Sequence, residues 1–312
     1  MRMLLALVIL SACGEDEIVS RDGRTPEVEV EVKSKPKPVD LTLSTLGAGL
    51  EMRHPIRDGN LTIIPIVATQ PVPDLHYVTL ADGLANHTVT VREKGRGNSF
   101  HVDHVSVHNK SIEPLFVMTG ELIFDGLQDR EIAEDRVLGP GERAAVSVRC
   151  VEQGREAGRL EFHASGLIAE LRIRQPTIFQ TQQEVWAAVE KLNAEHHLTP
   201  PTKTYRGVAE LQNATDAAAR RDGLARELAA LPERAHLVGL VAVSGTRIFD
   251  LVRFATPELY GQFEQELLGS YVASDDGPPH EGRTLLPADV RTFAESGQRR
   301  SSDAAIGVVV RP

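Results

Sequence analysis

The sequence predicts an α+β protein, in which an N-terminal antiparallel β domain, sandwich-like or barrel-like, precedes a smaller α+β domain. Between residues 60 and 175, short runs of alternating apolar and polar residues are separated by glycine, proline and asparagine. From residue 176 onward, apolar residues recur at helical spacing instead. The 312 residues are 41% hydrophobic and 25% charged, which is typical of a globular chain long enough for two domains.

The first segment, residues 1–12, resembles a bacterial lipoprotein signal peptide. Arg2 supplies a positive charge, residues 3–9 are apolar, and a Leu-Ser-Ala-Cys sequence ends at Cys13, as at a lipoprotein processing site. The alternative is an apolar N-terminal strand. The apolar run is far shorter than the ~18 residues of a transmembrane helix, so we expect an anchor made by lipid on Cys13. Because Gly14 follows in place of aspartate, the expected location is the outer membrane, facing the periplasm.

Residues 13–59 are expected to contain the lipidated cysteine and a flexible tether. Alternation over residues 27–32 resembles a strand, but a Lys- and Pro-rich run follows over residues 33–38 and favours an extended linker. The net charge of −10 and the pI near 5.6 argue against nucleic acid as a partner. With Cys13 lipidated, Cys150 has no second cysteine for a disulfide.

The β domain over residues 60–175 is predicted from a series of short runs. A proline at position 65 suggests that the first run is an edge strand or carries a bulge. Residues 80–85 are the one helical turn expected here. The expected strands are 61–67, 88–93, 102–108, 114–118, 121–124, 144–151, 160–163 and 167–173.

The α+β domain over residues 176–312 combines helices with a hairpin. Thr256 followed by Pro257 predicts the start of a helix, because threonine is a good N-cap and proline suits the first helical position. A Ser-Gly-Thr turn predicts the hairpin. The expected elements are helices 182–195, 215–230, 257–273 and 288–294, hairpin strands 236–243 and 248–254, and a last strand 305–310.

The densest set of polar residues lies at the ends of two β-type runs between residues 120 and 155, and comprises Gln128, Arg130, Glu152 and Arg155. If these runs are neighbours in a sheet, the four side chains meet at one end of the β domain. Two interpretations follow. In the favoured one, Glu152 and an arginine form an ion pair that clasps two loops together, and Arg155 is more exposed than Arg130. In the other, both guanidinium groups converge on a small anionic ligand.

Cys150 is expected to be buried and unreactive, because it shares its strand face with Val146 and Val148. The alternative is a nucleophile whose thiolate is stabilised by Arg149 or Arg155.

Histidines in residues 101–108 suggest a metal site at first sight. On a strand, His104 and His108 point to one face while His101 and Asp103 point to the other. The four cannot converge from one strand, so no metal site is predicted, although a two-histidine partial site stays open.

The ordered residues Gly120, Gly126, Gln128 and Arg130, followed by V-S-V-x-C-V-E-x-G-R ending at Arg155, resemble the ARG and rhodanese-phosphatase-superfamily-associated protein family. Weaker matches extend the resemblance over residues 60–271. The family pattern continues with tryptophan, where this chain has glutamate at position 156. The resemblance implies no established activity. The association in the family name implies a link to nucleotide or ADP-ribose metabolism, which by itself says nothing of mechanism.

These observations predict an envelope lipoprotein that binds a ligand or a partner, with a small anion as the candidate ligand and the membrane reached through the lipid. The alternative is a hydrolase or transferase acting on a phosphate- or ADP-ribose-like substrate. Arg130 and Arg155 would then stabilise charge, and Glu152 would act as acid or base. The common nucleotide-binding, zinc-protease and serine-hydrolase motifs are missing from the sequence, and it indicates no particular cofactor.

Overall fold

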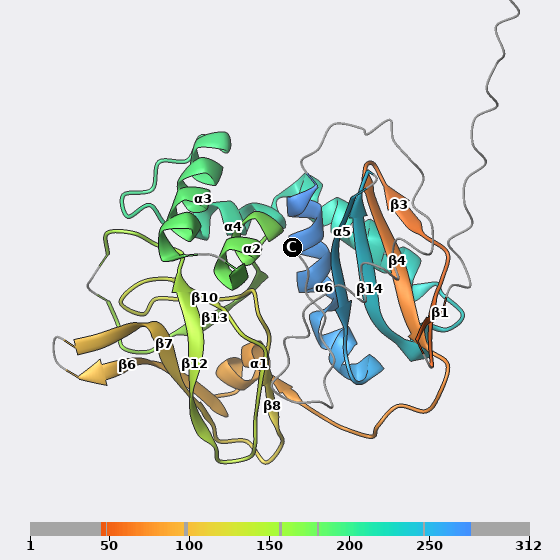
Figure 1. Cartoon of the computed structure of the whole chain (residues 1–312), viewed down its shortest axis with the longest axis horizontal. Coiled ribbons are helices and arrows are strands. Elements are labelled where there is room, and N and C mark those ends of the chain that lie inside the picture. The colour runs from red at the N-terminus through yellow and green to blue at the C-terminus, as the bar shows by residue number, and fades with distance from the viewer. Residues whose placement is uncertain are drawn as a thin grey trace, which may run out of the picture. The chain divides into compact units, whose positions relative to one another are not determined.

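The computed structural model describes residues 45–275, apart from positions 48, 97–98, 156–157, 180 and 246. Cys13, the expected helix 288–294 and the expected strand 305–310 lie outside the described residues. Within the described part the fold is α+β, as predicted, and the strands form three sheets that are antiparallel except for one pair (Figure 1). None of the helices in this part has the length and apolar character needed to span a membrane.

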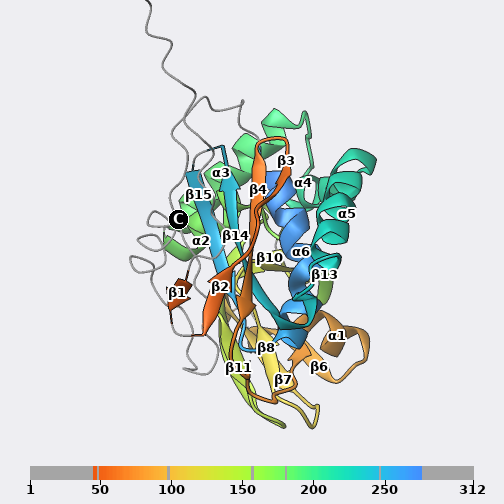
Figure 2. The same cartoon turned by 90° about the vertical axis from the view of Figure 1, so that its right-hand side faces the viewer.

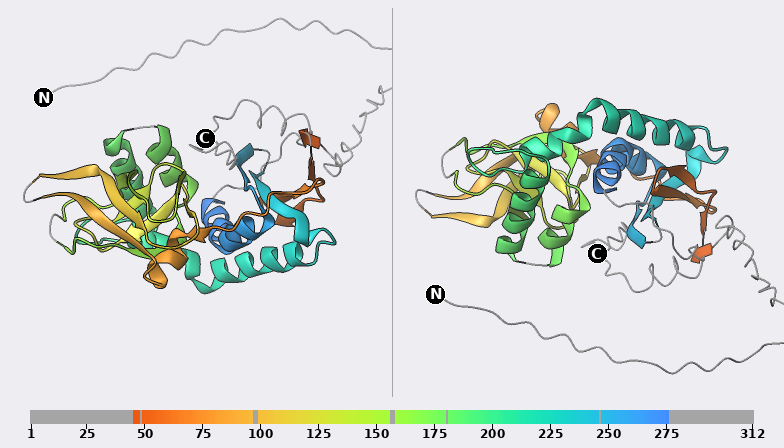
Figure 3. Two further views of the ribbon diagram at one scale, coloured as in Figure 1. Left: turned by 90° about the horizontal axis from the view of Figure 1, so that it is seen from below. Right: turned by 90° about the horizontal axis from the view of Figure 1, so that it is seen from above.

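The first sheet joins segments from opposite ends of the described chain. Its order is β1-β2-β4-β14-β15, and β3 also pairs with β4. The strand bounds are β1 Thr45–Gly47, β2 Leu50–Met52, β3 Ile56–Asp58, β4 Leu61–Ala68, β14 Leu237–Ser244 and β15 Arg247–Arg253. Helices α5 (Thr215–Ala229) and α6 (Pro257–Ser274) cover one face of this sheet (Figures 2 and 3).

Two expectations for the start of the domain need correction. The sequence predicts that residues 45–59 belong to the tether, but they supply β1, β2 and β3. Strands of three residues are too short to show an alternating pattern, and they are held by pairing, since β2 and β3 pair with β4 and β1 pairs with β2. In addition, β4 is an interior strand, so the edge strand suggested by Pro65 is wrong, whereas the alternative of a bulge agrees with a register shift in the β4–β14 pairing opposite Ile66 and Val67. Pro65 is tolerated because its missing N–H points to the gap between β2 and β3, where its carbonyl accepts a bond from Arg53 N at 2.9 Å.

The second sheet carries the central motif, and a small third sheet lies beside it. The second has the order β13-β9-β10-β12-β7-β6, and the third β11-β8-β5, with β5 and β8 parallel. The bounds are β5 Val78–Thr79, β6 Val89–Arg96, β7 Ser99–Asn109, β8 Leu115–Val117, β9 Glu121–Phe124, β10 Arg130–Ile132, β11 Arg136–Leu138, β12 Arg143–Cys150 and β13 His163–Ile168.

The helices begin where the local sequence provides caps. Thr256 accepts a bond from Leu259 N at 3.1 Å, and Pro257 opens α6, as predicted. A capping box of Thr181 and Glu184 opens α3. The remaining helices are α1 Leu80–Ala85, α2 Leu171–Phe179, α3 Gln182–Glu195 and α4 Arg206–Glu210.

The segment around Pro176 differs from the prediction. The expected strands 160–163 and 167–173 are replaced by β13 and by helix α2, which includes Pro176. A short apolar run such as Leu171 to Ile173 fits a strand or a buried helical turn equally well, so periodicity alone could not decide.

The core extends across the expected boundary at Pro176. Phe116 of β8 makes edge-to-face contacts with Phe254 and with Phe263 of α6, at centroid distances of 6.3 and 5.7 Å. Arg174 of α2 and Asp250 of β15, both fully buried, form an ion pair of 3.0 Å. Since β4 also pairs with β14, residues from both sides of Pro176 share one sheet and one apolar cluster.

Candidate functional site

The second sheet brings the two halves of the central motif together. β10 and β12 are antiparallel neighbours, and Arg130 lies opposite Cys150 in their register. Gln128 precedes β10, while Glu152 and Arg155 follow β12. All four predicted residues therefore lie at one end of this strand pair.

Glu152 lies just after the end of β12, and its side chain is only 3% exposed. Both carboxylate oxygens accept from Arg155 Nε at 2.9 Å, and Oε2 also accepts from Arg155 Nη2 at 2.7 Å. The backbone N–H of Asp129 donates to the same oxygen at 2.9 Å. The negative charge is thus balanced inside the protein.

Arg155 also donates hydrogen bonds to the loop that precedes β10. Its Nη1 donates to the carbonyl oxygens of Asp125 and Gly126 at 3.1 and 3.0 Å, and its Nη2 donates to Asp129 Oδ1 at 3.1 Å. The side chain is 24% exposed. The hydrogen bonds to Glu152 raise the pKa of the Arg155 guanidinium above its usual value, because they favour the charged form.

Two residues that the sequence analysis did not single out complete this network. Asp129, which is 1% exposed, accepts from Arg206 Nη2 at 2.7 Å and Nε at 3.1 Å, and from Thr204 Oγ1 at 2.8 Å. Arg206 opens α4, and its guanidinium carbon lies 4.4 Å from the Phe124 ring centroid. We call Asp129, Glu152, Arg155 and Arg206 the clasp. The position of Asp129 between Gln128 and Arg130 is a signal in the sequence that it belongs to this network, whereas the sequence around Arg206 contains no such signal.

Arg130 belongs to a separate contact set. Its side chain is 2% exposed, its Nη1 donates to Gln128 Oε1 at 2.9 Å and contacts Cys150 Sγ, and its Nη2 lies 3.5 Å from Glu93 Oε1. Gln128 Nε2 in turn donates to the Glu152 carbonyl oxygen at 3.2 Å. The two arginines of the motif therefore face different carboxylates and do not converge on a shared space.

Cys150 is buried, as predicted, with 1% of its surface exposed. Burial raises the pKa of its thiol, and the nearby Arg130 charge offsets only part of that shift. The thiol form is therefore favoured at neutral pH.

The histidines of β7 contact separate neighbours. His104 Nδ1 lies 3.1 Å from Asp103 Oδ1, and His108 Nδ1 lies 3.0 Å from Arg143 Nη2. In the part of the chain that the structure describes, no three histidine, cysteine or acidic residues are grouped so that they could hold a metal ion.

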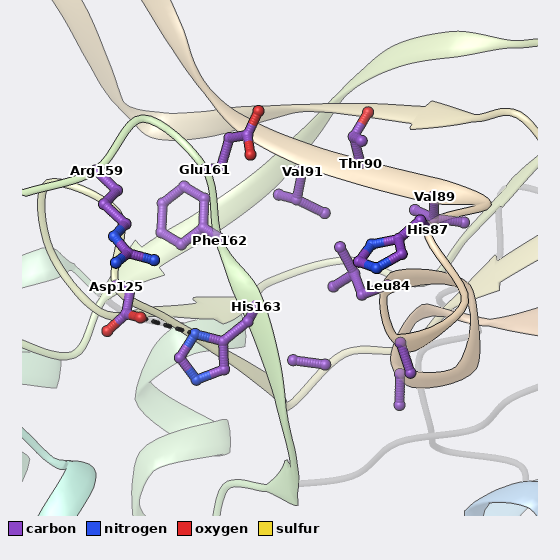
Figure 4. Close-up of a pocket in the computed structure, with 13 residues that line it drawn as sticks. Leu84, His87, Val89, Thr90, Val91, Asp125, Arg159, Glu161, Phe162 and His163 are labelled. Atoms are coloured by element: carbon purple, nitrogen blue, oxygen red, sulfur yellow. Dashed lines mark ion pairs between the residues drawn. The ribbon is translucent and has the colours of Figure 1, made fainter.

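A pocket of about 400 Å³ opens beside the clasp, between α1, β6 and β13 (Figure 4). Asp125 links the two features. Its carbonyl accepts from Arg155, and its carboxylate reaches the pocket, where Oδ2 lies 3.0 Å from His163 Nδ1. Burial alone would raise the pKa of Asp125, but the hydrogen bond from Arg206 and the charges of His163, Arg206 and Arg159 hold it below its usual value.

Fold and site together define a mixed α+β protein with mainly antiparallel sheets, whose most polar motif is an internally paired network next to a pocket. The chain belongs to the family of the ARG and Rhodanese-Phosphatase-superfamily-associated Protein domain, whose model matches residues 49–307. The family match confirms the resemblance over residues 60–271 and extends it at both ends. The function of this family is unknown. No curated protein and no solved structure matches the chain.

Proposed function

We propose that this chain is a binding protein of the cell envelope, and that the motif at residues 120–155 is a structural clasp and no active site. The observation that carries this proposal is the pairing of Glu152. Its carboxylate is buried, and the donors around it all belong to the protein itself, namely Arg155 and the Asp129 backbone. A buried charge that is paired and hydrogen-bonded in this way stabilises the loops it joins and is not available to a ligand.

The rival proposal is a hydrolase or transferase acting on a phosphate- or ADP-ribose-like substrate. That chemistry needs Arg130 and Arg155 to face one substrate, and needs Glu152 within reach of a proton in that substrate. The contacts support it poorly, because Arg130 lies by Glu93 and Cys150 while Arg155 is engaged with Glu152 and Asp129.

Melting temperatures of Glu152→Gln and Arg155→Gln test the clasp, and that of Arg130→Gln tests the separate buried contact of Arg130 with Glu93. Glu152→Gln leaves Arg155 without its main counter-charge and should cost about 3 kcal/mol, at the lower end for a broken buried pair because Arg155 is partly exposed. The melting temperature should fall by roughly 6–12 °C. Arg92→Gln is the matched control, since Arg92 and Glu161 are both more than half exposed and such pairs contribute about 0.2–1 kcal/mol. Near-native melting temperatures for both Glu152→Gln and Arg155→Gln would overturn the clasp.

The envelope location rests on the Leu-Ser-Ala-Cys sequence that ends at Cys13. Labelling cells with a fatty-acid probe tests it, because the wild-type protein should take up label and Cys13→Ser should not. Equal labelling of the two proteins would contradict lipid attachment at Cys13, while leaving the clasp proposal untouched.

A further inference from the structure

The pocket beside the clasp has an apolar interior. Leu84 of α1, Val89 and Val91 of β6, and Phe162 just before β13 contribute side chains to its wall. Figure 4 shows Arg159, Asp125 and His163 on one side and Leu84, His87 and Val89 on the other, with Phe162 and Val91 between them. Its volume of about 400 Å³ lies at the small end of the range for ligand sites.

The polar groups at its edge include both donors and acceptors of hydrogen bonds. Arg159 is exposed and donates no hydrogen bond to any residue that the structure describes. His163 is bound to Asp125 through Nδ1, and when Nδ1 carries the proton its Nε2 is a hydrogen-bond acceptor, so Arg159 is the donor available to an anion. The acidic residue Glu161, by contrast, is already engaged in an ion pair with Arg92. Arg159 therefore supplies the guanidinium donors that a ligand can reach, and its charge also helps to lower the pKa of Asp125.

The backbone at two of these positions is unusual. Asp125 has a φ of 83° and His87 a φ of 58°, in the left-handed region that residues other than glycine seldom adopt. They lie on opposite sides of the pocket (Figure 4). Such conformations persist only where the surrounding structure holds them, and they cluster at binding sites.

The clasp is what holds this side of the pocket. Arg155 donates to the carbonyl oxygens of Asp125 and Gly126. A Cβ on Gly126 would lie 2.1 Å from the Phe162 ring, and one on Gly158 would lie 2.1 Å from the Gly126 carbonyl oxygen. The segment that carries Arg159 and Phe162 is therefore packed directly against the clasped loop.

We infer that this pocket binds a small monocarboxylate with an apolar body, the carboxylate paired with Arg159 and the apolar body against Phe162 and Leu84. A guanidinium group holds a carboxylate through two parallel hydrogen bonds. Asp125 at the same site, and the net charge of −10, disfavour ligands with several negative charges. This inference rests on the proposed function, because it names the ligand class of the binding protein.

Titration calorimetry of the protein with 3-phenylpropionate tests the inference, with the neutral 3-phenylpropanamide and inorganic phosphate as comparison probes. The carboxylate should bind at least roughly tenfold more tightly than the amide or phosphate. Arg159→Gln should remove that preference by weakening carboxylate binding roughly tenfold or more, the usual effect of losing a charge-assisted hydrogen bond. Arg143→Gln is the matched control, because Arg143 is exposed at the start of β12 and is not part of the pocket wall, and it should bind like the wild type.

A second variant tests the position of the site. Ala85→Phe fills space at the wall contributed by α1 without touching Arg159, and it should weaken 3-phenylpropionate binding while the melting temperature stays near the wild-type value. Equal binding of acid and amide, equal binding by wild type and Arg159→Gln, or no binding of any probe would overturn the inference. None of these outcomes bears on the melting curves of the clasp variants, so the two proposals fail separately.

Discussion

Asp125 contacts the clasp and also lines the pocket, yet the charged side chains of these two regions differ in how they are compensated. In the clasp, Glu152 and Asp129 are at most 3% exposed, and two arginines and backbone N–H groups surround them. At the pocket, Asp125 and His163 are 38% and 53% exposed, and Arg159 has no hydrogen-bond partner among the described residues. A buried charge must be compensated by other groups of the protein, whereas an exposed charge is solvated by water and stays available to a ligand. The motif that is densest in the sequence is therefore the poorer candidate for binding.

The largest expected effect comes from Asp129→Asn, which removes the carboxylate that both clasp arginines share. We expect unfolding free energy to fall by about 3 kcal/mol, because two partly buried guanidinium groups lose a common partner. Urea denaturation measures it. Asp222→Asn is the control, since Asp222 is exposed and, within the part of the chain that the structure describes, its carboxylate pairs with the adjacent Arg221, and it should change stability by less than about 0.5 kcal/mol. Equal losses of unfolding free energy in the two variants would show that the clasp carboxylate stabilises the protein no more than a surface carboxylate does.

Gly126→Ala should come next, because the added methyl group meets the Phe162 ring at 2.1 Å. Overpacking of this kind costs roughly 1–3 kcal/mol, and it should disturb both the clasp loop and the pocket wall. Gly261→Ala should change stability in the opposite direction. It lies in α6 with nothing within 4 Å of the added Cβ, so alanine should stabilise by up to about 1 kcal/mol. A neutral Gly126→Ala would mean that the loop and Phe162 are not tightly packed.

The reactivity of Cys150 tests whether the part of the second sheet next to the clasp is accessible to solvent, and a smaller effect on stability is expected here. In a Cys13→Ser background Cys150 is the remaining thiol. Burial raises its pKa, so the native protein should react with a thiol reagent far more slowly than the denatured chain. Cys150→Ala should cost about 1 kcal/mol, as expected for a small core truncation. Rapid modification of the folded protein would show that this region opens readily.

The smallest effect is expected at the pocket, from Asp125→Asn. Asparagine accepts the left-handed backbone, and the pairs with His163 and Arg206 are both partly exposed, so stability at pH 7 should change by less than about 1 kcal/mol. The folded-state pKa of Asp125 lies below its ordinary value of 3.8. Its contribution is therefore present above pH 3.8 and is lost as the pH falls through the folded-state pKa. Denaturation curves between pH 2 and 6 should show a shallower loss in the variant, and identical slopes would contradict this role.

Local features of the sequence determined much of the fold. Alternating runs predict the strands β6, β7, β9 and β12, helical spacing predicts α3 and α5, and Thr256 with Pro257 fixes the start of α6. The order of glycines and charges at residues 120–155, with weaker matches on either side, resembles the family whose model matches residues 49–307. These signals succeed because they depend on residues a few positions apart, which periodicity and capping record directly.

Only the tertiary structure decided which groups meet. Asp129 and Arg206 are 77 residues apart, Arg130 finds Glu93 on a different strand, and β4 pairs with β14 across most of the described chain. The pocket likewise needs a helix end, β6 and β13 to come together. A charged residue carries no local mark of its partner, because the pairing is set by the order of strands in the sheets. The sequence therefore identified the motif, and strand pairing decided that its charged side chains bind one another. Arg159 at the pocket, by contrast, makes no hydrogen bond to any described residue.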